Sequence, residues 1–502
     1  MRVQLNLRLN PARILGERPP MLYGQFIEHF HRQIYGGIYQ PGHPLSDADG
    51  FRVDILDAMK RIRVPVLRWP GGCFVSAYHW RDGVGPERTP AFDKAWRVEE
   101  PNTFGTDEYI KLCRKLGCEP YICTNAGTGT PEEMSDWAEY CNLSSEGKYA
   151  KWRIANGFPE PHNVRYWSIG NENYGSWEIG AKSRDEWGRL VRESAKMLHR
   201  VSPRAELSAA ALPDVEWNLR LLQTCGEYLD WVSVHEYWDM MTEEHRPATY
   251  EECMAFTRRI DRSITKVRGM LCALGLEDRV KIAFDEWNLR SWHHPNVMTV
   301  RQGANPESYL TPRDLNDDNS TYTMADAVFT ACFLHALHRS CDIVGMANFS
   351  PVLNTTGLIC SYDGGIVLRS TYLVYELYVN HLGDQVIDLW MPGEVPSMEF
   401  PCKGGGSVRV ETLDVLATAF SDGPGFAVAL VNKHPDAPQE VTIPLEHPMS
   451  ARVYTVNGPD KDSYNDADRT EVTTTERSLG LCSCVSLTLP PHSVTLAELG
   501  RE

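Results

Sequence analysis

Residues 164–172 read VRYWSIGNE, and residues 280–287 read VKIAFDEW. Each stretch is a short apolar run with a carboxylate at or near its end, Glu172 in the first and Glu286 in the second. Near-continuous apolar runs of this length are typical of parallel strands that are covered on both faces. Both stretches therefore predict buried strands that carry an acid near the carboxyl end.

The same type of run recurs through the first three quarters of the chain, at residues 22–29, 64–70, 119–126, 206–211, 231–237 and 342–350. Helix-like patterns lie between the runs, at residues 51–63, 183–202, 250–274 and 322–339. Ser183 followed by Glu186 is typical of a capping box at a helix start. Eight βα repeats predict an α/β fold, a closed (β/α)8 TIM barrel. A doubly wound open sheet is the alternative, but the first strand ends in Glu28-His29 and not in a glycine-rich phosphate turn.

The pattern changes after about residue 384. Alternating runs at residues 408–413, 426–431, 451–456 and 485–489 predict a C-terminal all-β sandwich that is jelly-roll-like. The run at residues 3–9 also alternates, and we expect it to join that sandwich. We therefore expect three parts: an N-terminal strand (1–18), the barrel (19–384) and the sandwich (385–502). Gly404, Gly405 and Gly406 predict a turn.

The composition of the chain limits the classes of partner and the cellular locations that we expect. The net charge of -17 argues against a nucleic-acid or membrane partner, because both need a basic surface. No signal-peptide-like or membrane-spanning stretch is visible. The fourteen cysteines are scattered without a C-x-x-C pair, which favours reduced thiols and a cytoplasmic location. The composition does not exclude neutral substrates.

In a TIM barrel the reactive groups gather at the carboxyl ends of the strands. Glu172 and Glu286 end the fourth and seventh predicted strands, so we expect them to face each other across the mouth. Glycoside hydrolysis needs such a pair, one carboxyl to protonate the leaving oxygen and one carboxylate to attack carbon or activate water. Asn171 is placed to bond a sugar hydroxyl. Apolar faces for a sugar ring are expected from Trp69, Trp167, Trp238, Trp287 and Trp292.

Other polar residues near strand ends leave alternatives open. Arg68 either neutralises buried carboxylates or tunes a nucleophile, and His235 is either a core histidine or a site residue. Glu236 points to the opposite face and is interpreted as structural. Cys73 is interpreted as a neutral packing or binding residue, because no base lies nearby in the sequence. His293-His294 has no apparent third ligand, so we expect no metal site.

Five motifs resemble glycoside hydrolase family 51, the α-L-arabinofuranosidases. They are GQFIEHFHRQIYGGIYQPGHP (24–44), VLRWPGGCFVSAYHWRDGVGP (66–86), WSIGNENYGSWEIG (167–180), VSVHEYW (232–238) and FDEWN (284–288). The resemblance implies a retaining, cofactor-free double displacement with Glu172 as acid/base and Glu286 as nucleophile. It also implies that Glu28 and Asn171 bind sugar hydroxyls and that Arg68 and Tyr237 lie beside the nucleophile. It further implies an oligosaccharide substrate and a homo-oligomer, commonly a hexamer, in the cytoplasm.

Cys73, Trp292 and Asn348 complete the expected sugar-binding set. Cys73 and Asn348 stand where the family pattern suggests asparagine and glutamine, so the sequence leaves open which sugar the protein binds. The first hypothesis is release of terminal α-L-arabinofuranosyl residues from arabinan or arabinoxylan oligosaccharides. A second keeps the mechanism with a galactofuranoside, another pentofuranoside or a β-xyloside. A non-catalytic carbohydrate-binding protein is a third, although a pure binder has no need of opposed carboxylates.

Overall fold

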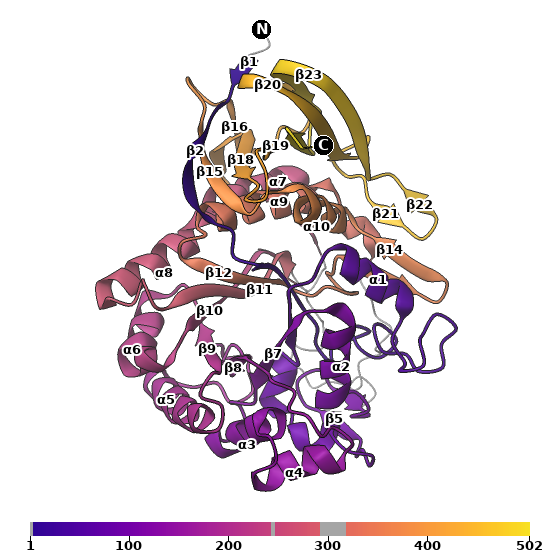
Figure 1. The fold of residues 1–502 in the computed structure, drawn as a ribbon, viewed down its shortest axis with the longest axis vertical. Helices are drawn as coiled ribbons and strands as arrows, with labels where there is room; N and C mark the ends of the chain where they lie inside the picture. Colours follow the sequence, from indigo (N-terminus) through magenta and orange to yellow (C-terminus); the bar gives the residue numbers. More distant parts are fainter. Residues whose placement is uncertain (1–3, 242–245, 292–317, 502) are drawn as a thin grey trace.

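A computed structural model describes residues 4–241, 246–291 and 318–501. Its centre is a closed barrel of eight parallel strands in the order β10-β11-β12-β3-β4-β7-β8-β9 (Figure 1). The barrel strands are β3 (Met21–Phe26), β4 (Val66–Trp69), β7 (Glu119–Thr124), β8 (Tyr166–Ile169), β9 (Glu206–Ala211), β10 (Trp231–Met240), β11 (Lys281–Ser291) and β12 (Val344–Phe349). The TIM barrel is confirmed, and each of its strands overlaps a predicted apolar run, although β3 begins one residue earlier and β10 and β11 extend past the ends of theirs.

Helices surround the barrel (Figure 1). They are α1 (Val53–Arg61), α2 (Thr106–Leu116), α3 (Pro131–Asn142), α4 (Gly147–Ala155), α5 (Arg184–Val201), α6 (Val215–Cys225), α7 (Tyr250–Phe256), α8 (Asp261–Leu274), α9 (Met324–Arg339) and α10 (Ser370–His381). The Ser183–Glu186 capping box is present at the start of α5. The single helix expected over 250–274 is wrong, because a 3-10 turn at Thr257–Arg259 separates α7 from α8. The Thr257 hydroxyl donates to the Met254 carbonyl at 2.7 Å, and such back-bonding bends helices. No helix of the described ranges could cross a lipid bilayer.

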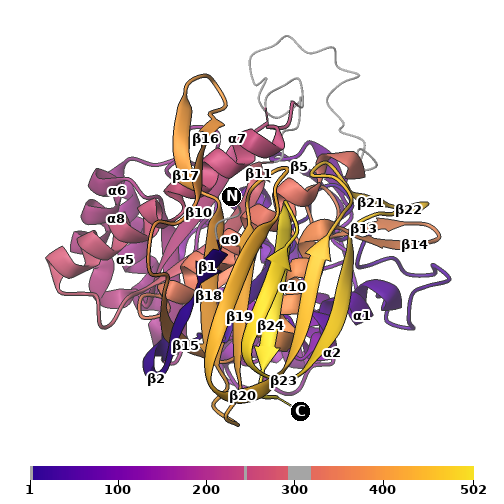
Figure 2. The same cartoon turned by 90° about the horizontal axis from the view of Figure 1, so that it is seen from above.

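The C-terminal strands form a second, all-β unit, the predicted sandwich (Figure 2). Its strands are β15 (Gln385–Trp390), β18 (Leu413–Ala419), β19 (Phe426–Asn432), β20 (Gln439–Asn457), β23 (Thr473–Leu489) and β24 (Ser493–Leu499). The pairing of β20 with β23 is irregular between Pro444 and Met449. Before that point β20 also pairs with the N-terminal strand β1, and beyond it with β24. The sheet therefore folds over on itself and encloses its own apolar core, which includes Leu7, Val428 and Leu487.

The N-terminal segment belongs to this sheet, as expected. Strand β1 (Gln4–Asn6) pairs with β20, and β2 (Arg8–Glu17) pairs with β15 at the edge. Four hairpins lie outside the sheet and the barrel: β5 (Ala91–Asp93) with β6 (Val98–Glu100), β13 (Ile359–Tyr362) with β14 (Gly365–Leu368), β16 (Ser397–Pro401) with β17 (Ser407–Glu411), and β21 (Asn465–Asp466) with β22 (Arg469–Thr470). The predicted strand 408–413 falls mainly in β17, and the glycine turn joins it to β16. We propose domain boundaries at 18/19 and 384/385, inside the connections β2–β3 and α10–β15.

Helices α9 and α10 lie between the barrel and the sandwich (Figure 1). The Asp414 carboxylate of β18 meets two side chains of α9, at 2.8 Å from His335 Nδ1 and 2.9 Å from Arg339 Nη1. Burial opposes ionisation of Asp414, but Arg339 and His335 outweigh it and hold the pKa of this carboxyl below its usual value. Asp414 therefore fixes the sandwich to the barrel through a charged hydrogen-bond pair.

Replacing Asp414 by alanine should lower the free energy of unfolding by about 1.5–3 kcal/mol, because a hydrogen-bonded charge is lost from a mostly buried contact. Urea denaturation followed by tryptophan fluorescence measures the change. Asp388→Ala is the matched control, since Asp388 pairs with the exposed Arg13 on the surface and should cost no more than about 1 kcal/mol. Equal losses in the two variants would contradict the assignment.

Candidate active site

Strand β11 carries two consecutive acids, Asp285 and Glu286, that both point into the barrel. In a regular strand successive side chains alternate between faces, so one of them should point outward. Relative to β10, the register steps from Ser233 opposite Ala283 to His235 opposite Glu286, which leaves one extra residue on β11. This β-bulge lets both carboxylates face inward, an arrangement that bulges produce next to active sites.

Glu172 owes its position to the turn that follows β8. Gly170 has φ +72°, and a Cβ there would lie 2.1 Å from the Asn173 Oδ1 atom. Glu172 itself has φ +44°, which is rare for a residue with a side chain and marks local strain. The turn directs the Glu172 carboxylate toward His235, whose Nδ1 atom lies 2.9 Å from Glu172 Oε1.

The carboxyl groups of Glu172 and Glu286 face each other over the barrel mouth. One carboxylate oxygen of each, together with a ring nitrogen of His235, forms a set in which all atoms lie within 4.8 Å of one another. Paired acids that form a covalent sugar intermediate lie about 5–5.5 Å apart, whereas pairs that hold a water between them need about 6.5–9.5 Å. The spacing therefore matches direct attack by one of the two carboxylates.

Two donors hold Glu286 in place. Arg68 Nη1 donates to Glu286 Oε2 at 2.8 Å, and the Tyr237 hydroxyl donates to Oε1 at 2.7 Å. Arg68 is completely buried, and its Nη2 atom donates to Asn171 Oδ1 at 2.7 Å. Of the two roles left open for Arg68, the structure shows both together, because it also lies 3.8 Å from the buried Asp285. Each carboxylate oxygen of Glu286 is thus held by a hydrogen bond.

His235 lies among three carboxylates and is not an isolated core histidine. It is 2.9 Å from Glu172, 3.4 Å from Asp285 and 3.5 Å from Glu286. Burial alone would lower the pKa of His235, but Glu286, Asp285 and Glu172 outweigh it and raise the pKa to about 10. Burial would raise the pKa of Glu172, but His235, Trp177 and Tyr174 together lower it. Without substrate, the proton of the His235–Glu172 pair therefore resides on the imidazole.

Glu28 lies on the Glu286 side of the mouth. Its Oε1 atom accepts the Phe74 backbone N–H at 3.1 Å and the Trp96 indole N–H at 2.7 Å. A Cβ at Gly72 (φ +58°) would lie 2.1 Å from Glu28 Oε2, so the carboxylate packs directly on this glycine. Burial and the Glu286 charge raise the pKa of Glu28 well above its usual value. The structure thus explains Gly72 of the GGCF stretch by its contact with Glu28, while Gly71 packs on the ring of Phe26.

Glu178 is a site-side acid that the sequence analysis missed. Its carboxylate is almost fully buried, accepts a hydrogen bond from the Ser76 hydroxyl, and lies within 4.8 Å of both Cys73 Sγ and a Glu172 oxygen. Burial raises the pKa of Glu178 to about 7. Burial and the neighbouring acids also raise the pKa of the Cys73 thiol, so Cys73 stays neutral and is no thiolate nucleophile. The signal was available in WEIG (177–180), but these residues lie on a loop rather than at a strand end.

The expectation that tryptophans offer an apolar face to a sugar ring is wrong for three of them. Trp69, Trp167 and Trp287 are fully buried in the core around the barrel, where they pack on other aromatic rings. Each faces outward from its strand, toward the helices. Trp238 likewise packs on Phe329 and Phe333 of α9, at 5.0 Å between ring centroids.

Two further expected sugar-binding residues, Asn348 and Trp292, stay predictions. Asn348 is fully buried, and its Nδ2 atom donates to the Gln25 carbonyl of β3 at 2.8 Å. Its Oδ1 atom has no hydrogen-bond partner among the described residues, so sugar binding by Asn348 stays a prediction. Trp292 and the pair His293-His294 lie outside the described residues. Glu236 faces away from the mouth and accepts a hydrogen bond from Ser263 of α8, in agreement with its structural interpretation.

Among the described residues, two sets of three side chains are close enough together to hold a metal ion. They are Glu172, His235 and Glu286, and Cys73, Glu172 and Glu178. In the first set Arg68 and the imidazolium already supply positive charge to the carboxylates. A metal cation there would face that charge at close range. The arrangement is therefore better suited to acid–base and nucleophilic chemistry by the carboxyl groups themselves.

Opposed carboxyl groups at the carboxyl ends of two barrel strands define a glycoside hydrolase. The comparisons with known proteins agree. Residues 58–257 match the family model described as alpha-L-arabinofuranosidase 1 domain, and residues 285–493 match alpha-L-arabinofuranosidase C-terminal domain.

Similar proteins extend over nearly the whole chain. The probable alpha-L-arabinofuranosidase C of Aspergillus niger is 32% identical, over 98% of this chain and 96% of its own. An intracellular exo-alpha-(1->5)-L-arabinofuranosidase of Acetivibrio thermocellus is 33% identical, over 74% of this chain and 75% of its own. The crystal structure of alpha-L-arabinofuranosidase from Thermotoga maritima in an arabinose complex is 35% identical, with a TM-score of 0.86 and 99% of both chains covered. The chain belongs to the GH51 α-L-arabinofuranosidase family.

Glu178→Gln should make the protein less sensitive to rising pH. A carboxyl whose pKa is about 7 in the fold, above its ordinary value, retains a proton that the unfolded chain releases. Stability is therefore lost as the pH rises from about 4.5 to 7, in total on the order of 3 kcal/mol. Glutamine has no proton to lose, so between pH 5 and pH 8 the variant should lose about 2.5 kcal/mol less free energy of unfolding than wild type, measured by urea denaturation. Glu236, whose pKa burial likewise raises to about 7, contributes the same loss to both proteins.

Glu193→Gln is the matched control for this measurement, because Glu193 lies exposed on α5. It should follow the wild-type pH dependence over the same interval. A Glu178→Gln profile that coincides with wild type would show that Glu178 ionises freely in the folded protein.

Proposed function

We propose that the protein is an exo-acting hydrolase that releases terminal α-L-arabinofuranosyl residues from arabinan- or arabinoxylan-type oligosaccharides by double displacement. The observation that carries the proposal is the short separation of the Glu172 and Glu286 carboxyls, with Glu286 oriented by Arg68 and Tyr237. The relatives from Aspergillus niger and Acetivibrio thermocellus, both named as arabinofuranosidases, support arabinofuranose as the sugar. The same spacing supports net retention at the anomeric carbon.

In the first step the Glu286 carboxylate attacks the anomeric carbon, and the bond from that carbon to the glycosidic oxygen breaks. Glu172 delivers a proton to the departing oxygen, so the leaving saccharide departs as a neutral alcohol. That proton comes from the His235–Glu172 pair, whose atoms lie 2.9 Å apart. In the second step Glu172 removes a proton from water, the resulting oxygen attacks the same carbon, and the bond to Glu286 breaks.

The groups around the pair suit a neutral sugar. Asn171 Nδ2 is buried and has no hydrogen-bond partner among the described residues, so it can donate to a hydroxyl beside the reacting carbon. Glu28, whose raised pKa favours the protonated form, can exchange hydrogen bonds with hydroxyls. Cys73 closes the same region as a neutral thiol. A galactofuranoside, another pentofuranoside or a β-xyloside is the alternative, and a panel of aryl glycosides separates these sugars.

We also propose that the enzyme works in the cytoplasm as a homo-oligomer, with a hexamer as first expectation. The intracellular relative from Acetivibrio thermocellus supports the location. Size-exclusion chromatography with light scattering tests the oligomer.

Glu286→Ala should lower kcat for 4-nitrophenyl α-L-arabinofuranoside by several orders of magnitude, because the nucleophile is lost. Glu172→Ala should be impaired mainly with poor leaving groups, and azide should partly restore its turnover of this activated substrate by replacing water in the second step. Proton NMR of the azide product should show the α-configured sugar azide, because azide displaces Glu286 from the β-linked sugar–enzyme intermediate in a second inversion and needs no general base. Full activity in either variant would overturn the assignment of the pair.

His235→Gln should move the alkaline limb of the pH profile of kcat/KM to lower pH. In the wild-type enzyme the shared proton is retained until the pH approaches the His235 pKa of about 10. In the variant Glu172 must hold the proton alone, and a carboxyl releases it earlier. His199→Gln, on the outer helix α5, is the control and should keep the wild-type profile. An unchanged alkaline limb in His235→Gln would show that His235 does not hold the proton that Glu172 delivers.

A further inference from the structure

Asp285 is a fully buried carboxylate that takes no part in the mechanism described above. The bulge in β11 turns it into the barrel next to Glu286. Its Oδ1 atom accepts a hydrogen bond from the Ser233 hydroxyl at 2.7 Å, and its Oδ2 atom accepts one from the Tyr121 hydroxyl at 2.6 Å. Both donors are neutral, so they orient the carboxylate without balancing its charge. A buried charge of this kind also needs a cation.

Two cations lie close to Asp285. Arg68 Nε is 3.8 Å from Oδ2, and His235 Nε2 is 3.4 Å from Oδ1. Both nitrogens are buried, and neither forms a regular hydrogen bond within the described ranges. Arg68 has two further nitrogens, which donate to Glu286 and Asn171, whereas the imidazole has one. The imidazolium therefore depends on Asp285 more than the guanidinium does.

The His235 ring lies between Asp285 and the proposed acid/base. Its Nδ1 atom is 2.9 Å from Glu172 Oε1 and 3.5 Å from Glu286 Oε2, whereas its Nε2 atom faces Asp285. Strand β9, the other neighbour of β10, contributes the uncharged residues 208–211 beside it. Glu172 and Glu286 both react with the substrate in the proposed mechanism. Of the three carboxylates that contact the imidazole, Asp285 is therefore the one that keeps its charge through the whole cycle.

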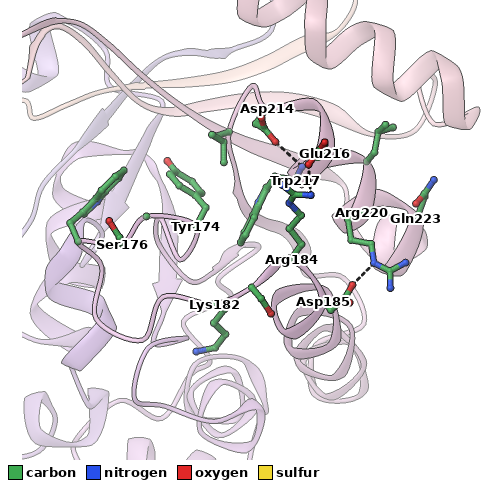
Figure 3. A pocket seen from close by; sticks show the side chains of 15 residues that line it. Tyr174, Ser176, Lys182, Arg184, Asp185, Asp214, Glu216, Trp217, Arg220 and Gln223 are labelled. Carbon is green, nitrogen blue, oxygen red and sulfur yellow. Dashed lines mark hydrogen bonds and ion pairs between the residues drawn. The ribbon is translucent and has the colours of Figure 1, made fainter.

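Glu172 also borders a groove of about 1210 Å³, which lies between the loop that follows β8 and helices α5 and α6 (Figure 3). Two residues that line the groove contact the acid/base. The Tyr174 hydroxyl donates to Glu172 Oε1 at 3.2 Å, and the Trp177 indole N–H donates to Oε2 at 2.9 Å. Glu172 can therefore exchange protons with water through the groove. A proton that is to be retained must lie on the buried imidazole of His235, where its charge has to be balanced.

We propose that Asp285 is a positioning residue for the hydrolysis, whose fixed charge orients the imidazole of His235 and keeps it protonated for Glu172. The proposal rests on the function proposed above. As the glycosidic bond breaks, the Nδ1 proton of His235 passes to Glu172 and on to the leaving oxygen. In the second step Glu172 takes a proton from water and returns it to Nδ1. Asp285 stays ionised and forms no bond to the substrate.

The charge of Asp285 is stable in this environment. Burial would raise the pKa of this carboxyl, but His235 and Arg68 outweigh it and, with the Tyr121 hydroxyl, hold the pKa below its ordinary value. In the same cluster the pKa of His235 is about 10. Asp285 and His235 therefore form an ion pair at neutral pH.

Asp285→Asn keeps the size of the side chain and removes its charge. With α-1,5-arabinobiose, whose departing sugar needs a proton, the alkaline limb of the kcat/KM profile should move to lower pH by about 1 pH unit or more. The reason is that a carboxylate this close raises the pKa of an imidazole by about 1–3. A purely structural defect would lower the whole profile and leave the limb in place, and that result would overturn the proposal.

Tyr121→Phe is the matched control, because it removes a hydrogen bond from Asp285 and keeps the carboxylate. Its alkaline limb should stay at the wild-type pH. In the double variant Asp285→Asn/His235→Gln, the limb should coincide with that of His235→Gln, because Asp285 acts through the imidazole. A further shift would mean that Asp285 acts on Glu172 directly, and the assignment to His235 would fail.

Nitrogen NMR of histidine-labelled enzyme measures the charge of the imidazole without substrate, and His235→Gln identifies the signal. In Asp285→Asn the His235 signal should titrate at lower pH than in wild type. If Asp285→Asn does not fold, Glu172→Gln takes its place. There 4-nitrophenyl α-L-arabinofuranoside should leave Glu286 esterified, because no base activates water, so Asp285 is the carboxylate left beside the imidazole. His235 should still be charged at pH 7, and a neutral ring would overturn the proposal.

The outcomes distinguish the two proposals. If no arabinofuranoside is hydrolysed at any pH, the proposed function fails. If arabinofuranosides are hydrolysed and Asp285→Asn moves neither the alkaline limb nor the His235 titration, the function stands and the role of Asp285 is overturned.

Discussion

The structure depends on one electrostatic constraint, the burial of several carboxylates at the mouth of an otherwise apolar barrel. A buried charge costs several kcal/mol unless it is paired and hydrogen-bonded. Asp285 and Glu286 are adjacent, and Glu172 faces them, yet two cations, Arg68 and His235, contact this group. The imbalance leaves about one net negative charge in the cavity when His235 is protonated. Such a fixed charge stabilises positive charge that develops on a sugar carbon in the transition state.

The strands of the barrel could be predicted from the sequence, but the local irregularities that orient the site residues could not. Each barrel strand overlaps a near-continuous apolar run, because a strand covered on both faces is mainly apolar. The bulge at Asp285 has no such signature, since one extra residue changes the direction of side chains without changing composition. Trp287 and Trp177 show the same limit. Trp287 follows Glu286 in the sequence yet packs on Phe333, whereas Trp177 lies on a loop and contacts Glu172.

The C-terminal unit supports the barrel strand that carries the proposed nucleophile. Its hairpin β16–β17 places Lys403 Nζ 2.5 Å from Asp239 at the end of β10. Asp239 in turn lies 3.0 Å from Arg290 of β11, which also binds Asp326 of α9 at 2.8 Å. Arg290 follows Glu286 by four positions on the same strand. The hairpin therefore closes a buried ion network that fixes the end of the strand carrying the proposed nucleophile.

The surroundings of the two acids differ in the way their proposed roles require. A nucleophile must stay ionised and aligned, and Glu286 has a donor on each oxygen, one of them the buried cation Arg68. An acid/base must give up a proton and regain one in every cycle, so it needs a proton donor and a route to water. Glu172 has His235 on one side and the open groove with Trp177 on the other. If the roles were exchanged, the acid would be Glu286, which lies farther from His235 than Glu172 does, 3.5 Å against 2.9 Å. Its two oxygens already accept hydrogen bonds from Arg68 and Tyr237, neither of which readily releases or accepts a proton near neutral pH.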